Sequence, residues 1–111
     1  DMAPWPPRGS NPYWSRLTTW WLDWDKLVAW HGREPADLAE YVAWSQEKQA
    51  LMLGMDCAAA KRRFPWCGGW LLWSGHDTFP LCINSSLIDF EGGLKPSALE
   101  MKRIWHRKAG S

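Results

Sequence analysis

The chain has 111 residues, enough for one small domain and too few for two. Hydrophobic residues make up 46% of it, which supplies the material for a core and argues against wholesale disorder. The formal net charge of +1 gives no overall field that would attract nucleic acid or an anionic membrane, and no apolar run is long enough to span a bilayer.

The first fifteen residues contain four of the eight prolines, together with Gly9, Ser10 and Asn11. Proline fixes φ and is excluded from helix interiors, so this stretch predicts an extended or looping entry segment. It lacks the charged-then-apolar layout of a secretory leader. Because the chain does not begin with Met, we expect it to be a piece of a longer protein.

Tryptophan is the compositional outlier, with eleven copies against three Phe and two Tyr. A flat indole packs a large area at low entropic cost, and its face also suits the apolar face of a sugar ring. Most of the eleven are expected to be packing residues. A packing cluster is predicted from Trp20, Trp21, Trp24 and Trp30.

Three helices are predicted in chain order. The first covers roughly residues 23–30 and is closed by Gly32. The second covers residues 33–63, with Pro35 near its first turn, acidic residues early and Lys61, Arg62 and Arg63 at its end. The third covers residues 95–108 and has Pro96 in its first turn.

Between the last two helices, "WLLWS" at residues 70–74 is apolar at successive positions and follows two glycines. This pattern predicts a buried strand of a parallel sheet. One strand cannot satisfy its own backbone donors and acceptors, so the sequence predicts part of a larger α/β structure that is helix-rich when taken alone.

The predicted strand runs directly into Ser74-Gly75-His76-Asp77. At the carboxyl end of a barrel strand, such a polar group would face an active site. The alternative is structural, with the Asp77 carboxylate capping the following turn and His76 bonding to nearby backbone. The residues alone leave both interpretations open.

"GGWLLWSGHDTFP" and "NSSLIDFEGGLKPSALEMKRIW" together resemble the end of the catalytic (β/α)8 barrel in glycoside hydrolase family 2, which includes β-mannosidases, β-galactosidases and β-glucuronidases. The shared pattern is an aromatic-Trp-polar strand end, His-Asp, an aromatic and a proline, then a "D-x-x-G-x-x-K-P" turn into a helix. Upstream, "SQEKQA" is similar to the preceding barrel helix. The resemblance covers roughly residues 30–107.

The resemblance implies that Trp73 forms the floor of the subsite for the sugar being cleaved, with His76 and Asp77 at its rim, contacting hydroxyls or fixing loops. Phe79 and Pro80 would hold the loop in shape, and Gln46 and Gln49 would be structural hydrogen bonders. Residues 1–32 would be a Pro/Trp-rich loop after barrel strand seven, and residues 33–111 the C-terminal barrel portion. The implied partners are a β-glycoside substrate and the rest of the barrel, with no cofactor.

Retaining glycosidases use two carboxylates about 5 to 5.5 Å apart. In the family that this chain resembles, both are glutamates at strand ends. None of the glutamates here follows a strand in that way: they are Glu34, Glu40, Glu47, Glu91 and Glu100. Both catalytic residues are therefore expected upstream of Asp1, and the 111 residues alone are expected to be inactive.

Two other functions remain as alternatives. The chain could be a stand-alone Trp-rich module that binds carbohydrate or protein without chemistry. It could also use His76 and Asp77 as a metal pair, although His31 and His106 sit in contexts with no ligand pattern. A zinc site from His76 with Cys57, Cys67 and Cys82 matches no known spacing, and the odd number of cysteines fits no disulfide framework. Sugar specificity and compartment stay open, and a periplasmic or extracellular location suits the full-length enzyme.

Overall fold

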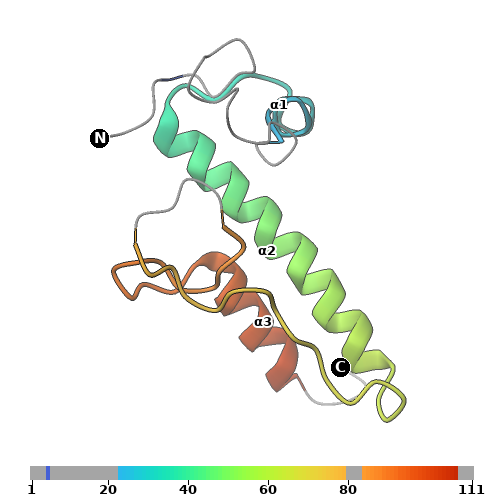
Figure 1. The fold of residues 1–111 in the computed structure, drawn as a ribbon. Coiled ribbons are helices and arrows are strands. Elements are labelled where there is room, and N and C mark those ends of the chain that lie inside the picture. Colours follow the sequence, from blue (N-terminus) through green and yellow to red (C-terminus); the bar gives the residue numbers. More distant parts are fainter. Residues whose placement is uncertain (1–4, 6–22, 80–83, 108–111) are drawn as a thin grey trace. The chain divides into compact units, whose positions relative to one another are not determined.

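The structure is a computed structural model, and it describes residue 5, residues 23–79 and residues 84–107 (Figure 1). In these ranges the chain forms three helices: α1 (Trp24–His31), α2 (Leu38–Arg62) and α3 (Pro96–His106). The prediction of a helix-rich chain is confirmed. The chain divides into two compact units, residues 1–45 and 46–111, and the division falls within α2.

The first unit has a small aromatic core. Leu27 of α1 is buried with Tyr41 and Trp44 of α2, and Trp24 and Leu38 pack against them. Trp24 thus takes the predicted packing role, whereas Trp30 is about half exposed. Trp20 and Trp21 lie outside the described residues.

Local hydrogen bonds set the ends of the helices in this unit. Gly32 ends α1 with a left-handed φ of 73°, and its N–H donates to the Val28 carbonyl at 2.8 Å, as predicted. The Asp37 carboxylate accepts the Glu40 N–H at 2.8 Å, and Glu40 reaches back to the Ala36 N–H at 2.7 Å. This reciprocal capping explains why α2 begins at Leu38, five residues later than predicted.

In the second unit, α3 lies beside the second half of α2 (Figure 1). The contact is close at Gly54, where an added Cβ would lie 3.0 Å from Glu100 Cγ and 3.3 Å from Ile104 Cδ1. At the C-terminal end of α3, Lys61 Nζ donates to the carbonyls of Ile104 at 2.8 Å, Trp105 at 3.0 Å and Arg107. Lys61 therefore satisfies carbonyls that the helix end leaves open.

The strand predicted over residues 70–74 is not formed, so that prediction is wrong for the described part of the chain. Two isolated bridges are present instead, a parallel one between His76 and Ile88 and an antiparallel one between Ile88 and Leu94. Leu71 is 97% exposed, against the expected burial on both faces. A strand exists only through its ladder partners, and residues 70–74 have none among the described residues.

Tyr41 generates a prediction for the stability of the first unit. Burial, with the nearby Asp23 charge, raises the pKa of Tyr41 to about 12 from an ordinary value near 10. The folded state therefore favours the neutral phenol. The contribution of the neutral Tyr41 phenol to the stability of the folded state is complete below pH 10, and it is lost as the pH rises toward 12. We expect an alkaline loss on the order of 2 kcal/mol in the free energy of urea unfolding. Tyr41→Phe should lack this component of the pH dependence, and an unchanged alkaline profile in the variant would contradict the assignment.

Candidate functional site

Trp73 has an exposed side chain on a backbone that a neighbouring loop holds by a hydrogen bond. Its side chain is 86% exposed, while its carbonyl accepts a hydrogen bond from Ser85 Oγ at 2.9 Å. Ser74 follows with a left-handed φ of 69°, which is unusual for a residue with a Cβ. The segment therefore projects an indole from a turn that a second loop holds in place.

Asp77 lies four residues further on and is only 5% exposed. Its Oδ1 accepts hydrogen bonds from Ser86 Oγ at 2.6 Å and from Asn84 Nδ2. Its Oδ2 pairs with Lys95 Nζ at 2.9 Å. The Lys95 ammonium also donates to Ser86 Oγ at 2.7 Å, which closes a small polar network. We call Asp77, Asn84, Ser86 and Lys95 the Asp77 network.

Burial opposes ionisation of Asp77, but its partners outweigh that effect. The hydrogen bonds from Ser86, Lys95 and Asn84, with the positive charge of Lys95, hold the pKa of Asp77 below its ordinary value. The carboxylate is thus ionised, and both of its oxygens are occupied within the protein. In this arrangement it links the loop at residues 76–77 to the loop at residues 84–86.

The Asp77 network is continuous with the two helices of the second unit. Gln49 Nε2 of α2 donates to the carbonyls of Ser85 at 2.9 Å and Ser86 at 3.2 Å. Gln49 Oε1 accepts from the buried Ser97 Oγ of α3 at 3.2 Å. The structural interpretation of Gln49 is confirmed. The half-buried Gln46 side chain forms no hydrogen bond with another described residue.

His76 has an exposed side chain, and backbone pairing fixes its position. The carbonyl of Gly75 accepts from the N–H groups of Leu87 and Ile88, both at 3.0 Å, and Asp77 N–H donates to the Ile88 carbonyl at 2.9 Å. The three predicted site residues therefore divide by accessibility: Trp73 and His76 are open to solvent, and Asp77 lies behind them.

A tight turn places Lys95 in the network. Asp89 Oδ1 accepts from Gly93 N–H at 2.7 Å and from Glu91 N–H at 3.0 Å, and Gly92 has a φ of 89°. A Cβ on Gly93 would lie 2.6 Å from Asp89 Oδ2, so a larger residue there would displace the Asp89 carboxylate that holds the turn. The Lys95 N–H then donates to the Leu87 carbonyl at 2.9 Å, directly before α3 begins at Pro96.

Sequence reasoning missed Asn84, Ser86 and Lys95 as partners of Asp77. Their polar character is visible in "NSS" and "LKP", but such residues are common in loops and carry no pairing information. The bridges between residues 76, 88 and 94, with the turn at Asp89, bring them around one carboxylate.

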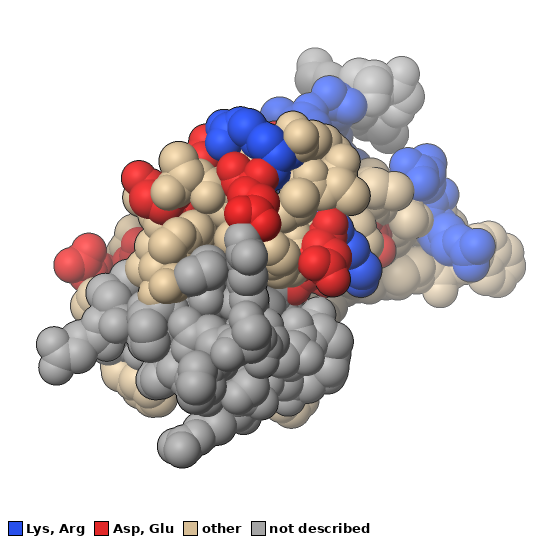
Figure 2. Space-filling view, turned by 90° about the horizontal axis from the view of Figure 1, so that it is seen from above, with Lys and Arg blue, Asp and Glu red and all other residues tan. Residues whose placement is uncertain are grey.

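Among the described residues, no three His, Cys, Asp or Glu side chains are grouped so that they could hold a metal ion. Cys57 is buried and Cys67 is a free thiol, while Cys82 lies outside the described ranges. No helix in the described part combines the length and apolar character needed to cross a membrane. On the face shown in Figure 2, acidic and basic residues are interspersed.

Comparisons with protein-family models, with curated proteins and with solved structures find no match to this chain.

The Asp77 network predicts that breaking its buried ion pair costs much more free energy of unfolding than breaking an exposed ion pair. Asp77→Asn leaves the 11%-exposed Lys95 ammonium without its carboxylate, and we expect a loss of about 3 kcal/mol in the free energy of unfolding. Lys95→Met in the same chain should recover part of it. As a control, Glu100→Gln breaks the exposed pair with Arg103 and should cost less than about 1 kcal/mol. Equal costs for Asp77→Asn and Glu100→Gln would contradict the network.

Proposed function

We propose that this chain is the C-terminal portion of the catalytic barrel of a retaining glycoside hydrolase, similar to the β-mannosidases and β-galactosidases of family 2. It would contribute part of the wall that binds the sugar. The observation that carries the proposal is the exposed Trp73 indole on a backbone anchored by Ser85. Because the backbone that carries the indole is anchored, less of the chain must be ordered when the ring stacks on the apolar face of a sugar.

The accessibility of the neighbouring residues refines their proposed roles. His76 lies three residues from Trp73 with its ring in solvent, so it can donate to or accept from a sugar hydroxyl. Asp77 is a positioning residue in this proposal, because its two oxygens already hold Ser86, Asn84 and Lys95. It fixes the turn from which Trp73 and His76 project.

The segment that carries Trp73 also supports the barrel. No backbone N–H of residues 70–73 donates to another described residue, and Leu71 and Trp73 project into solvent. Backbone that makes no hydrogen bond within the described chain, beside exposed apolar side chains, is open to pairing with another strand. Strands from the rest of a barrel would supply both the hydrogen bonds and the cover.

Catalysis belongs to the rest of the protein in this proposal. Glu40 is held by Arg33 through hydrogen bonds of 2.9 and 2.5 Å, and Glu100 by Arg103 at 2.8 and 2.5 Å. Carboxylates paired in this way are poor nucleophiles and poor proton donors. The 111 residues would therefore bind part of the substrate and hydrolyse nothing alone.

One observation favours a second function, a stand-alone binding module without chemistry. Trp66 is 94% exposed, so the second unit presents another open indole besides Trp73. Exposed aromatic side chains of this kind are typical of carbohydrate-binding and protein-interaction surfaces.

The decisive experiment expresses the complete reading frame that contains this chain and assays 4-nitrophenyl β-mannoside, β-galactoside and β-glucuronide. We expect hydrolysis of at least one, with retention of anomeric configuration by NMR. Trp73→Ala should lower kcat/KM by more than about tenfold, because stacking stabilises the transition state. Trp66→Ala is the matched control and should stay close to the parent.

Three results would count against the proposal. If the protein from the complete reading frame has no glycosidase activity, the stand-alone binding module becomes the favoured function. Equal kcat/KM values for Trp73→Ala and Trp66→Ala would remove Trp73 from the sugar site. Hydrolysis by the 111 residues alone would show that the catalytic carboxylates lie within this chain.

A further inference from the structure

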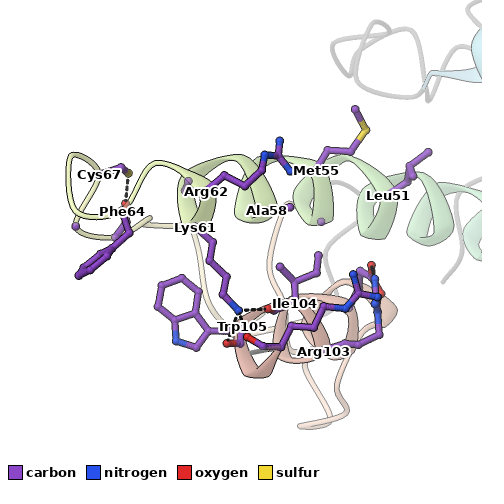
Figure 3. Close-up of a pocket in the computed structure, with 16 residues that line it drawn as sticks. Leu51, Met55, Ala58, Lys61, Arg62, Phe64, Cys67, Arg103, Ile104 and Trp105 are labelled. Carbon is purple, nitrogen blue, oxygen red and sulfur yellow. Dashed lines mark hydrogen bonds and ion pairs between the residues drawn. The ribbon is translucent and has the colours of Figure 1, made fainter. Parts of the chain in front are cut away.

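A groove in the second unit lies between α2, α3 and the turn at residues 64–69 (Figure 3). Its volume is about 660 Å³, within the range of small-molecule sites. Leu51, Met55 and Ala58 line it from α2, Ile104 and Trp105 from α3, and Phe64 from the turn. Figure 3 shows Ile104 pointing from α3 toward α2.

The groove changes character along its length. On α2, Leu51, Met55, Ala58 and Arg62 recur at helical spacing and form one stripe, apolar first and cationic last. On α3, Ile104 precedes Arg107. The two cationic ends lie together, because Lys61 of α2 donates to the last carbonyls of α3. On α2 the groove is therefore apolar at the Leu51 end and positively charged at the other end, while α3 contributes the Glu100–Arg103 ion pair near Gly54.

Charge in the groove is unbalanced. Four basic residues line it (Lys61, Arg62, Arg103 and Arg107), against the single acid Glu100. Arg103 already pairs with Glu100 at 2.5 Å, and Lys61 is engaged by backbone carbonyls. Arg62 forms no ion pair with a described residue. An anion at that end would meet uncompensated positive charge.

We propose that this groove binds an amphipathic anion, a carboxylate with a linear alkyl chain. The chain would lie along Leu51, Met55 and Ile104, and the carboxylate would be held at the end formed by Arg62 and Arg107. From Leu51 to Arg62 the helix rises about 16 Å, comparable to the extended length of a medium-chain fatty acid. The site is separate from Trp73 and does not depend on the proposed glycosidase function.

The test uses dodecanoate below its micelle concentration, with dodecyltrimethylammonium as a cation of the same chain length. Calorimetry should show saturable binding of dodecanoate and not of the cation. Cys67 lines the groove as a free thiol, so dodecanoate should also slow its alkylation by iodoacetamide, followed by peptide mass spectrometry.

Matched variants separate the two ends of the groove. Arg62→Gln should weaken dodecanoate binding by about tenfold, whereas Arg63→Gln, outside the groove, should leave it unchanged. Met55→Asp should have a similar effect to Arg62→Gln, and Met52→Asp should not. Met55 and Met52 are 60% and 51% exposed, so neither change disturbs a core.

Equal binding of the cation, or equal affinities of Arg62→Gln and Arg63→Gln, would overturn the proposal. So would a ligand-independent dimer in sedimentation equilibrium that Met55→Asp dissociates, because a second copy would then occupy the groove. If Met55→Asp fails to fold by circular dichroism, the comparison of the two arginine variants decides alone.

Discussion

The second unit depends on one buried charge pair, the contact between Asp77 and Lys95. Each residue satisfies the other where little water reaches, and Ser86 contacts both. A buried ion pair of this kind adds little net stability, but removing one partner leaves a charge without compensation. The pair therefore restricts the geometry of the second unit. The loops at residues 76–77 and 84–86 must both lie next to Lys95, the residue before α3.

That requirement links the helices to the exposed indole. Gln49 attaches α2 to the carbonyls of Ser85 and Ser86, and Ser85 in turn holds the carbonyl of Trp73. Trp73 is thus four residues from a buried carboxylate and one hydrogen bond from a loop attached to the long helix. An anchored backbone lowers the conformational entropy that would be lost if the Trp73 indole bound a flat ligand.

The helices could be predicted from the sequence because their determinants are local. Gly32, Asp37 and Pro96 lie at or beside helix ends, and their effects need no distant partner. The error at residues 70–74 has the opposite origin. An apolar run indicates that a segment can be a strand, but the pairing that makes it one comes from outside the segment.

The candidate site divides in the same way. His76 could be identified as a candidate from its place after an apolar run, and Trp73 is a candidate through the resemblance alone, although its run is predicted to be buried. The burial of Asp77 could not be predicted. Its burial depends on Asn84, Ser86 and Lys95, which lie up to eighteen residues away and meet it through long-range pairing that includes the bridges at Ile88. From the sequence, Asp77 could either contact sugar hydroxyls or fix neighbouring loops, and the described contacts favour the second role.

The attachment of α3 at two points along α2 restricts how this region can change in length. Gln49 holds the start of α3 through Ser97, and Lys61 holds its end. An inserted or deleted residue between them would turn one anchor by about 100° around the helix axis relative to the other. Both contacts could not then persist. Residues 49–61 therefore have a fixed register relative to α3.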